Sequence, residues 1–482
     1  MRRISVIAVL SVCIVANIQA QSETHALRYS IHNPFGTARY AAQGGAIGAL
    51  GGDLSAIQIN PAGLGFYRTS EFSFTPSFYW VNTSSSFMNT EIRDSWVKLN
   101  VGSLGFVTAK TSNRTSGLVG ATFAVGYNTL VNFNKRTTIR AEHAQSSLLD
   151  DFAWNANAFP DDMSPFYEQV AINAYLLPYD QTAGEYWNDI QNGGYDQGLD
   201  RISEQSGYIG EYALSGAFNF SNLLYFGATA GIHSVRFYDD IFHMESDPDN
   251  HIPEFSEFQF RELNSTRGWG YTFRFGMIVR PVQQLRIGAS FQTPVYYYLT
   301  EEISTELSSY WDGGSPISDT TAFSPYGIND FRLRSPLRAR AHASLVLFKM
   351  ATVSAEYEFV DYSTARLNPQ STYTDNNFRI QQDLKAGHNV RAGAEVRFKS
   401  LYFRGGLQYL SSPYTDSRND ASEWIFSVGS GIRTKRAFFD ASYSRGSLSE
   451  VYGMYSKTPG VNEVSLNTLN PNNLMFTLGL KF

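Results

Sequence analysis

The sequence predicts an all-β protein: a transmembrane antiparallel β-barrel of about fourteen strands, with a small helical or irregular hatch at its amino-terminal end that plugs the lumen. Three observations predict this fold. Many segments alternate apolar and polar residues, their connections are alternately short and long, and a segment rich in glycine and alanine precedes the first strand. Composition agrees, because aromatic residues make up 15% of the chain and charged residues only 17%. Barrels place aromatic residues on the lipid face and in girdles at both membrane interfaces.

Residues 1–20 have the layout of a secretory signal peptide. Two arginines at positions 2 and 3 precede an apolar run at 4–18, and residues 18–20 offer a small-residue cleavage site before Gln21. The alternative is an uncleaved amino-terminal anchor. The only cysteine, Cys13, follows Val12, where a lipoprotein signal needs a small residue, so we do not expect lipidation there. A mature chain without cysteine excludes a disulfide framework, a thiolate metal site and a cysteine nucleophile.

Residues 21–70 are expected to form the hatch. The stretch 30–66 is rich in Gly and Ala and shows no period-two alternation, and such small residues allow close backbone packing. Asp53 or Ser55 could cap a short helix there, and Asn60-Pro61 marks a turn. A compact element of this kind would fit inside a barrel as a plug. The alternative is a flexible periplasmic leader, against which the Ile and Leu content of the stretch argues.

Residues 71–482 are expected to form the barrel. Strand side chains alternate with period two, so one face can be apolar while the other is small or polar. Residues 269–279, for example, place aromatic and aliphatic side chains on one face and Gly, Thr and Arg on the other. No run of about eighteen apolar residues follows the expected signal peptide, which leaves a closed sheet as the way to cross a bilayer. The expected strands span 71–80, 96–109, 118–131, 208–220, 222–237, 266–280, 283–299, 333–348, 350–362, 386–399, 401–411, 422–434, 436–446 and 473–482.

The connections between these strands sort by length. Short turns at one end and long loops at the other are the rule for outer-membrane barrels, and a soluble sandwich has no reason to follow it. An even strand number also returns the carboxy-terminus to the short-turn, periplasmic end. Tight joins are expected at 221–222, 281–284, 349, 399–400 and 434–436, and long extracellular stretches at 132–207, 238–265, 300–332, 363–385, 412–421 and 447–472.

The last ten residues form the clearest strand. Leu474, Phe476, Leu478, Leu480 and Phe482 share one side, and the residues between them are small or polar apart from one methionine. A soluble edge strand is the alternative, since alternation is common in antiparallel sheets. The terminal phenylalanine resembles the assembly signal of bacterial outer-membrane proteins. We therefore expect the bacterial outer membrane as the location, and its lipid and the barrel-assembly machinery as partners.

Charged side chains on the polar faces are expected to line the lumen. A charge in mid-strand costs several kcal/mol against lipid but is tolerated in the interior. Such arginines could meet a carboxylate head group of a ligand. The alternative is that they pair with interior acids such as Glu356, Glu358 and Glu395. The arginines in question are Arg274, Arg338, Arg340 and Arg391.

The stretch 132–207 is long enough to hold structure of its own. Phe166, Val170, Ala174 and Leu177 recur at near-helical spacing. An amphipathic helix over the barrel mouth could offer an apolar capture surface. The same face could instead pack onto neighbouring loops.

The hatch segment resembles a known family. Its motif is similar to the amino-terminal hatch of FadL/TodX-type outer-membrane transporters of hydrophobic compounds, and the opening at 40–46 is similar to Bacteroidetes-like members. The resemblance implies a fourteen-stranded barrel plugged by this hatch. Motif-level similarity is confined to residues 37–66 and the last strand. The residues that carry the hatch motif are Gly44, Gly45, Asp53, Asn60, Pro61, Ala62 and Gly63.

The resemblance also implies a function. Members of the family take up apolar molecules through an extracellular groove and a lumen pocket, and release them sideways beside an inwardly kinked third strand. Gly120 and Gly126 lie in the expected third strand, and glycine in a strand often marks a bulge or bend. We therefore expect a local break in pairing there. The alternative is that both glycines make room for the hatch.

Other functions fit the sequence less well. The net charge of −6 argues against a nucleic-acid partner. No paired histidine spacing predicts a zinc site, residues 245–250 lack the glycine and closing glutamate of a calcium loop, and no motif places a nucleophile beside a base. We expect no enzyme activity and no cofactor. The two alternative functions are a structural or adhesive barrel that binds a macromolecule through its loops, and a general porin; a hatch is unnecessary in the first and pointless in the second. The sequence leaves the substrate open between long-chain fatty acids and aromatic hydrocarbons.

Overall fold

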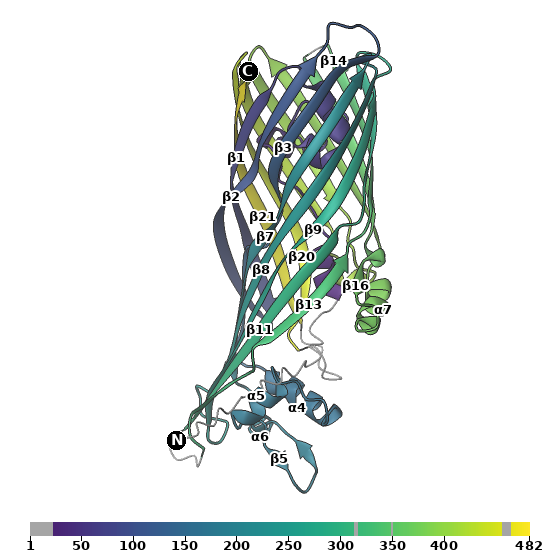
Figure 1. The fold of residues 1–482 in the computed structure, drawn as a ribbon. Coiled ribbons are helices and arrows are strands. Elements are labelled where there is room, and N and C mark those ends of the chain that lie inside the picture. The colour runs from purple at the N-terminus through teal and green to yellow at the C-terminus, as the bar shows by residue number, and fades with distance from the viewer. Residues whose placement is uncertain (1–22, 313–316, 349, 456–463) are drawn as a thin grey trace, which may run out of the picture.

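The computed structural model describes residues 23–312, 317–348, 350–455 and 464–482 (Figure 1). The expected signal peptide at 1–20 and the tight join at Lys349 lie outside these residues. Within them, fourteen strand positions form one closed antiparallel barrel, because β21 (Val464–Lys481) pairs with β1 (Glu71–Phe87). The predicted fold class is confirmed.

Four of the fourteen positions are each occupied by more than one strand in succession. β10 and β11 together follow β9 around the barrel, and β13 and β14 together follow them. β4 continues the position of β3, and β16 that of β15. The remaining bounds are β2 Thr90–Thr111, β3 Leu118–Asn132, β4 Lys135–Ala141, β7 Gly198–Phe220, β8 Leu224–Ser246, β9 Phe255–Val279, β10 Leu285–Gln292, β11 Tyr296–Trp311, β12 Thr320–Phe323, β13 Gly327–Arg334, β14 Arg338–Leu347, β15 Ala351–Asp361, β16 Arg366–Asn368, β17 Ala386–Phe398, β18 Leu401–Leu410, β19 Glu423–Arg433 and β20 Ala437–Gly453.

Period-two alternation decides which side chains face outward. On β21, Leu478 and Leu480 are exposed while Met475 and Thr477 between the outward residues are fully buried. Phe482 lies outward too and stacks on Phe106 with ring centroids 5.6 Å apart. The apolar face therefore points to lipid and the polar face to the lumen, as the last strand predicts.

Short and long connections lie at opposite ends of the barrel. The end with the short connections is here called the turn end, and the opposite end the loop end. The turn end holds 112–117, 221–223, 280–284, 399–400 and 434–436. The chain leaves the barrel at the turn end, where the Phe482 amide donates to the carbonyl of Ser70 at 3.1 Å.

Several expected loops are instead strand. Most of 238–265, 300–332 and 447–472 continues the ladders of β8, β9, β11, β13, β20 and β21, so the expectation of long loops there is wrong. In Figure 1, β7, β8, β9 and β11 reach far past the rest of the barrel. Outward-facing side chains are apolar only along the part of a strand that lies in the membrane, whereas the hydrogen-bonded ladder continues beyond it. The end of the apolar pattern therefore indicates the membrane boundary and not the end of the strand.

Two groups of helices lie at the loop end. One, here called the cap, follows β4, and its elements are α4 Leu148–Ala158, α5 Glu168–Asn173, β5 Tyr179–Asp180, β6 Glu185–Tyr186 and α6 Asp189–Asn192. The other follows β15 and consists of η2 Tyr362–Thr364 and α7 Thr374–Asp383; η3 Ser417–Asn419 lies before β19.

The amino-terminal segment lies inside the barrel. It contains α1 Glu23–Arg28, α2 Ala38–Ala42, α3 Ala56–Ile59 and η1 Pro61–Phe66, and most of its side chains are buried. α2 contacts β18–β21, while η1 contacts β7–β9 on the other side of the lumen. No helix among the described residues is long and apolar enough to cross a membrane.

Candidate functional site

The hatch is held against the barrel wall by glycines on both partners. Gly44 has φ +59° and its backbone lies against β17 and β18, where a side chain on it would approach the Leu407 amide nitrogen to 2.7 Å. A side chain on Gly393 or Gly406 of the wall would overlap the backbone of hatch residues Gln43 or Gly44. This close approach explains why both surfaces lack side chains at these positions.

The Asn-Pro-Ala-Gly motif docks in the same way on the opposite wall. The Asn60 side chain accepts a hydrogen bond from the Ala62 amide at 3.2 Å, which caps η1. Its amide group donates to the carbonyl of Met277 at 3.4 Å. The wall facing the motif is again glycine, since a side chain at any of three positions would meet Asn60 or Pro61. These positions are Gly227, Gly276 and Gly288.

Asp53 joins two parts of the hatch. Its carboxylate accepts hydrogen bonds from the Thr37 hydroxyl at 2.9 Å and from the Ser55 amide at 3.0 Å. Ser55 itself makes no side-chain cap to α3 but accepts from the Thr37 amide at 2.8 Å. Asp53 therefore closes the loop between α2 and α3.

The predicted lumen arginines are paired with glutamates. Arg274 contacts Glu211 at 2.6 Å, and Arg391 contacts Glu356 at 2.9 Å. Arg338 and Arg340 both contact Glu358, at 3.2 and 2.5 Å. All these side chains are almost completely buried, so the geometry favours internal pairing over the expectation that these arginines bind a ligand carboxylate. Glu395, the third expected acid, pairs with Arg39 of the hatch and with Arg404.

The third strand stays paired at both glycines, with a register shift between Leu118 and Gly120 on the β7 side. Gly120 pairs with Thr111 of β2 and with Asn219 of β7, and Gly126 pairs with Gly105 and Ala213. A side chain on Gly126 would lie 3.4 Å from Ile57 of the hatch, so this glycine makes room for the plug. A glycine shows where a chain can bend, whereas pairing depends on the neighbouring strand.

A break in the wall does occur, but it begins after Asn128, toward the loop end of β3, and only on the side of β3 that faces β2. The β2–β3 ladder ends at Ser103 and Asn128. Beyond it, the Thr129 hydroxyl donates to the carbonyl of Val101 at 2.7 Å. In the described structure, residues 90–102 of β2 pair with β1 alone. Leu99 on this segment is 66% exposed.

The hatch takes the place that β2 vacates. The amide of Asn33 donates to the carbonyl of Leu130 at 3.2 Å, and the amide of Phe35 donates to that of Thr129 at 3.0 Å. A bulge between Thr129 and Val131 on β3 accompanies the change of partner. An extended hatch segment therefore completes the ladder where the wall opens.

A cavity of about 240 Å³ lies directly behind this segment. Among the described residues that line it there are seven Asn, Gln, Glu and Ser side chains and no Lys or Arg. The Phe35 and Tyr79 rings, 5.6 Å apart, both belong to its wall. Its main apolar residues are Ile31, Pro34, Phe35, Leu130, Val131 and Leu448, and its polar ones Asn33, Asn132, Gln408, Glu423, Ser444, Asn472 and Asn473. Sequence reasoning missed this cavity, because its residues come from the hatch and six different strands.

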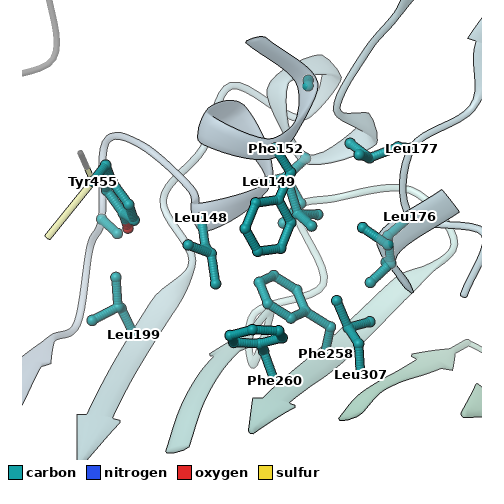
Figure 2. Packing of buried hydrophobic residues seen from close by; sticks show 14 of the residues in the cluster. Leu148, Leu149, Phe152, Leu176, Leu177, Leu199, Phe258, Phe260, Leu307 and Tyr455 are labelled. Atoms are coloured by element: carbon teal, nitrogen blue, oxygen red, sulfur yellow. The ribbon is translucent and has the colours of Figure 1, made fainter. Parts of the chain in front are cut away.

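The predicted capture face is buried in the cap. Phe166, Val170, Ala174 and Leu177 are each at most 4% exposed. Figure 2 shows the surrounding packing, with Phe152 of α4 above Phe260 of β9 and Leu177 beside them. The second alternative, packing onto neighbouring elements, therefore holds, and the expectation of an exposed capture surface at these four residues is corrected. Apolar residues at helical spacing predict that one face of a helix is buried, but they do not predict which element covers that face.

His25 of α1 gives the hatch a pH-dependent anchor. Burial, with a smaller effect of Arg28, lowers the pKa of this imidazole to about 3, and Glu301 of β11 lies 3.9 Å from it. Because the free side chain has a pKa of about 6.5, undocking takes up a proton below that pH. Docking of α1 is therefore strongest above pH 6.5 and weakens as pH falls.

We expect hydrogen–deuterium exchange of residues 23–31, corrected for intrinsic rates, to show protection that falls by up to about tenfold per pH unit below 6.5. His25→Gln should remove this part of the pH dependence. Unchanged pH dependence in the variant would show that another group controls docking.

Solved structures with a similar fold include outer-membrane barrels. A crystal structure of a Pseudomonas aeruginosa FadL homologue has a TM-score of 0.55 and 12% identity, covering 94% of this chain and 100% of that one. The Pseudomonas putida toluene transporter TodX has a TM-score of 0.52 and 12% identity, covering 92% and 98%. The chain has the FadL/TodX-type fold. No family model and no curated protein matches the sequence.

The barrel described here is closed, and its lumen holds the amino-terminal segment. No group of three or more His, Cys, Asp or Glu side chains in its described part is placed to hold a metal ion.

Proposed function

We propose that the protein is a bacterial outer-membrane channel for the uptake of hydrophobic small molecules, in which a ligand passes from the cavity sideways through the wall between β2 and β3. The observation that carries this proposal is the contact between the cavity and the wall opening. Residues Asn33–Phe35 form the boundary of both, so a small movement of one hatch segment would connect them. The turn end then faces the periplasm and the cap faces the exterior.

A sideways exit suits an apolar ligand. A hydrophobic molecule gains nothing from an aqueous path through the hatch, whereas an opening in the wall leads it into hydrocarbon. The exposed edge of β2 carries apolar residues on this route, including Val97 and Leu99. The buried hatch in the lumen also argues against a general porin, which needs an open aqueous path for polar solutes.

The cavity favours a small, uncharged ligand over a long-chain fatty acid. A carboxylate needs a cation or several donors when it is buried, and the cavity holds Glu423 but no basic side chain. Its volume lies below the range of about 300–1,000 Å³ typical of sites for drug-sized ligands. The toluene transporter named above shares the fold, which supports a compound of one-ring size.

Linking β2 to β4 across the wall opening is expected to abolish uptake. Asp94 of β2 accepts hydrogen bonds from the Thr138 amide at 2.8 Å and hydroxyl at 3.2 Å, so this pair spans the opening. Residues 21–482 contain no cysteine, which makes Asp94→Cys/Thr138→Cys a clean double variant. A short, reducible thiol cross-linker should block uptake of labelled toluene by whole cells, and reduction should restore it.

The control pair is Ser84→Cys/Arg93→Cys, which joins two residues already paired in the β1–β2 ladder. Cross-linking this pair should leave uptake unchanged. Full uptake by the cross-linked Asp94/Thr138 variant would rule out the sideways exit. A labelled long-chain fatty acid measured in parallel tests the substrate class, and faster uptake of it than of toluene would contradict the uncharged ligand.

A further inference from the structure

Outward-facing aromatic side chains form a ring around the barrel. Trp269 lies ten residues before the end of β9, which corresponds to about 25 Å of height for a strand tilted by about 40°. This equals the apolar band of an outer-membrane barrel, so the ring marks the interface at the loop end. Its stacked or tilted pairs are Trp269–Tyr298, Tyr271–Tyr296, Tyr409–Trp424 and Trp80–Tyr443.

One sector of this ring carries free arginines. Arg332 and Arg334 of β13 lie opposite Tyr298 and Tyr296 of β11 and are exposed. The Arg332 guanidinium lies 5.4 Å from the centre of the Tyr298 ring. Within the described chain neither arginine makes an ion pair. Arg366 lies opposite Arg334 on β16 and adds a third positive charge.

Arg332 borders a hollow on the outer wall. This hollow has a volume of about 890 Å³, and its lining includes Arg267, Trp269, Tyr298 and Arg332. The only acid that lines it, among the residues described, is Asp330, which accepts a hydrogen bond from the Thr300 hydroxyl at 2.6 Å. Among the described residues of this lining, Arg267 pairs with Glu302 while Arg332 makes no ion pair, so the hollow offers one unpaired guanidinium at the height of the membrane interface.

The same face stays polar above the ring. Arg261 pairs with Asp240 at 2.7 Å and Arg136 with Glu204 at 3.0 Å, around a second hollow of about 370 Å³. Alternating donors and acceptors of this kind suit a hydrated, hydroxyl-rich partner. The sector therefore changes with height from lipid-facing aromatic rings, through free arginines, to a polar surface.

We propose that this sector binds the phosphorylated head group of a glycolipid in the outer leaflet, with its phosphate on Arg332 and Arg334. Planar guanidinium groups bind phosphate through paired hydrogen bonds, and the Trp269–Tyr298 pair offers a flat surface for a sugar ring. The acyl chains then lie along the apolar wall below. This site depends on placement in the outer membrane and is independent of transport through the lumen.

The test uses the full protein in detergent and diphosphorylated lipid A as the probe. We expect native mass spectrometry to show bound lipid, with Arg332→Gln/Arg334→Gln weakening binding at least tenfold. Arg114→Gln, an exposed arginine in the turn at 112–117, is the matched control and should bind like the wild type. Toluene uptake by the double variant should be unchanged, which separates this site from the proposed channel.

Two further probes identify what is recognised. Dephosphorylated lipid A should bind as weakly to the wild type as the intact lipid does to the double variant. Equal binding of the intact lipid to wild type and double variant would overturn the proposal. Displacement of the lipid by inorganic phosphate at equal concentration would also overturn the proposal, because the site would then bind a free anion as well as it binds the lipid. A heat-dependent gel shift confirms that each variant is folded.

Discussion

Gly406→Leu is expected to displace the hatch from the lumen and convert the closed barrel into an open aqueous pore. Any side chain at Gly406 would overlap the backbone of Gln43 and Gly44, and backbone cannot move aside as a flexible side chain does. The barrel itself should persist, because β18 keeps its ladders with β17 and β19. We expect large, steady conductance in planar bilayers and sensitivity of cells to bulky polar antibiotics.

The neighbouring Gly405 provides a matched control. A side chain there would meet only the carbonyl oxygen of Ser427, at 3.9 Å. Gly405→Leu should therefore conduct no more than the wild type. If Gly406→Leu folds, as judged by its heat-dependent gel shift, and still conducts no more than Gly405→Leu, then the hatch does not close the pore by docking at this site.

Glu358→Ala is expected to destabilise the barrel more than any exposed charge does. The carboxylate is completely buried and accepts hydrogen bonds from Arg338, Arg340 and, at 2.9 Å, from Asn389. Its removal leaves two buried guanidinium groups short of a partner, and a third, that of Arg391, lies 3.5 Å away. Breaking a buried ion pair of this kind costs about 3–5 kcal/mol.

Urea unfolding followed by the gel shift measures this loss. Glu91→Ala is the control, because Glu91 and its partner Arg93 are both exposed, and we expect no measurable change from it. Glu358→Gln should lie between the two, since it keeps the hydrogen-bonding shape but loses the charge. A midpoint for Glu358→Ala equal to that of Glu91→Ala would show that the arginines find water or other partners.

Local patterns predicted the barrel well. The fourteen expected segments all correspond to strand positions, because side-chain alternation depends on neighbouring residues along one strand. The tight joins at 221–222 and 399–400 were predicted for the same reason, and the structure places Ser221, Asn222 and Lys399 at positive φ. The glycines of the hatch motif were recognised as a dense small-residue segment.

Contacts between distant residues were beyond this reasoning. Interior acids were named as possible partners of the arginines, but which acid meets which arginine depends on which strand lies alongside. The same holds for the partners of the buried face of α5 and for the place where β2 leaves β3. Gly126 illustrates the difference, since the sequence left a bend and room for the hatch as alternatives, and only the structure places Ile57 of the hatch beside it.

The sequence by itself determined a closed, lipid-facing sheet with a small-residue plug before it, because period-two polarity and residue size act within one segment. Only the tertiary structure decided where the wall opens, which hatch residues complete it and what lines the cavity behind them. These features arise where segments far apart in the chain, such as Asn33 and Leu130, share backbone hydrogen bonds, and nothing in either segment alone carries that information.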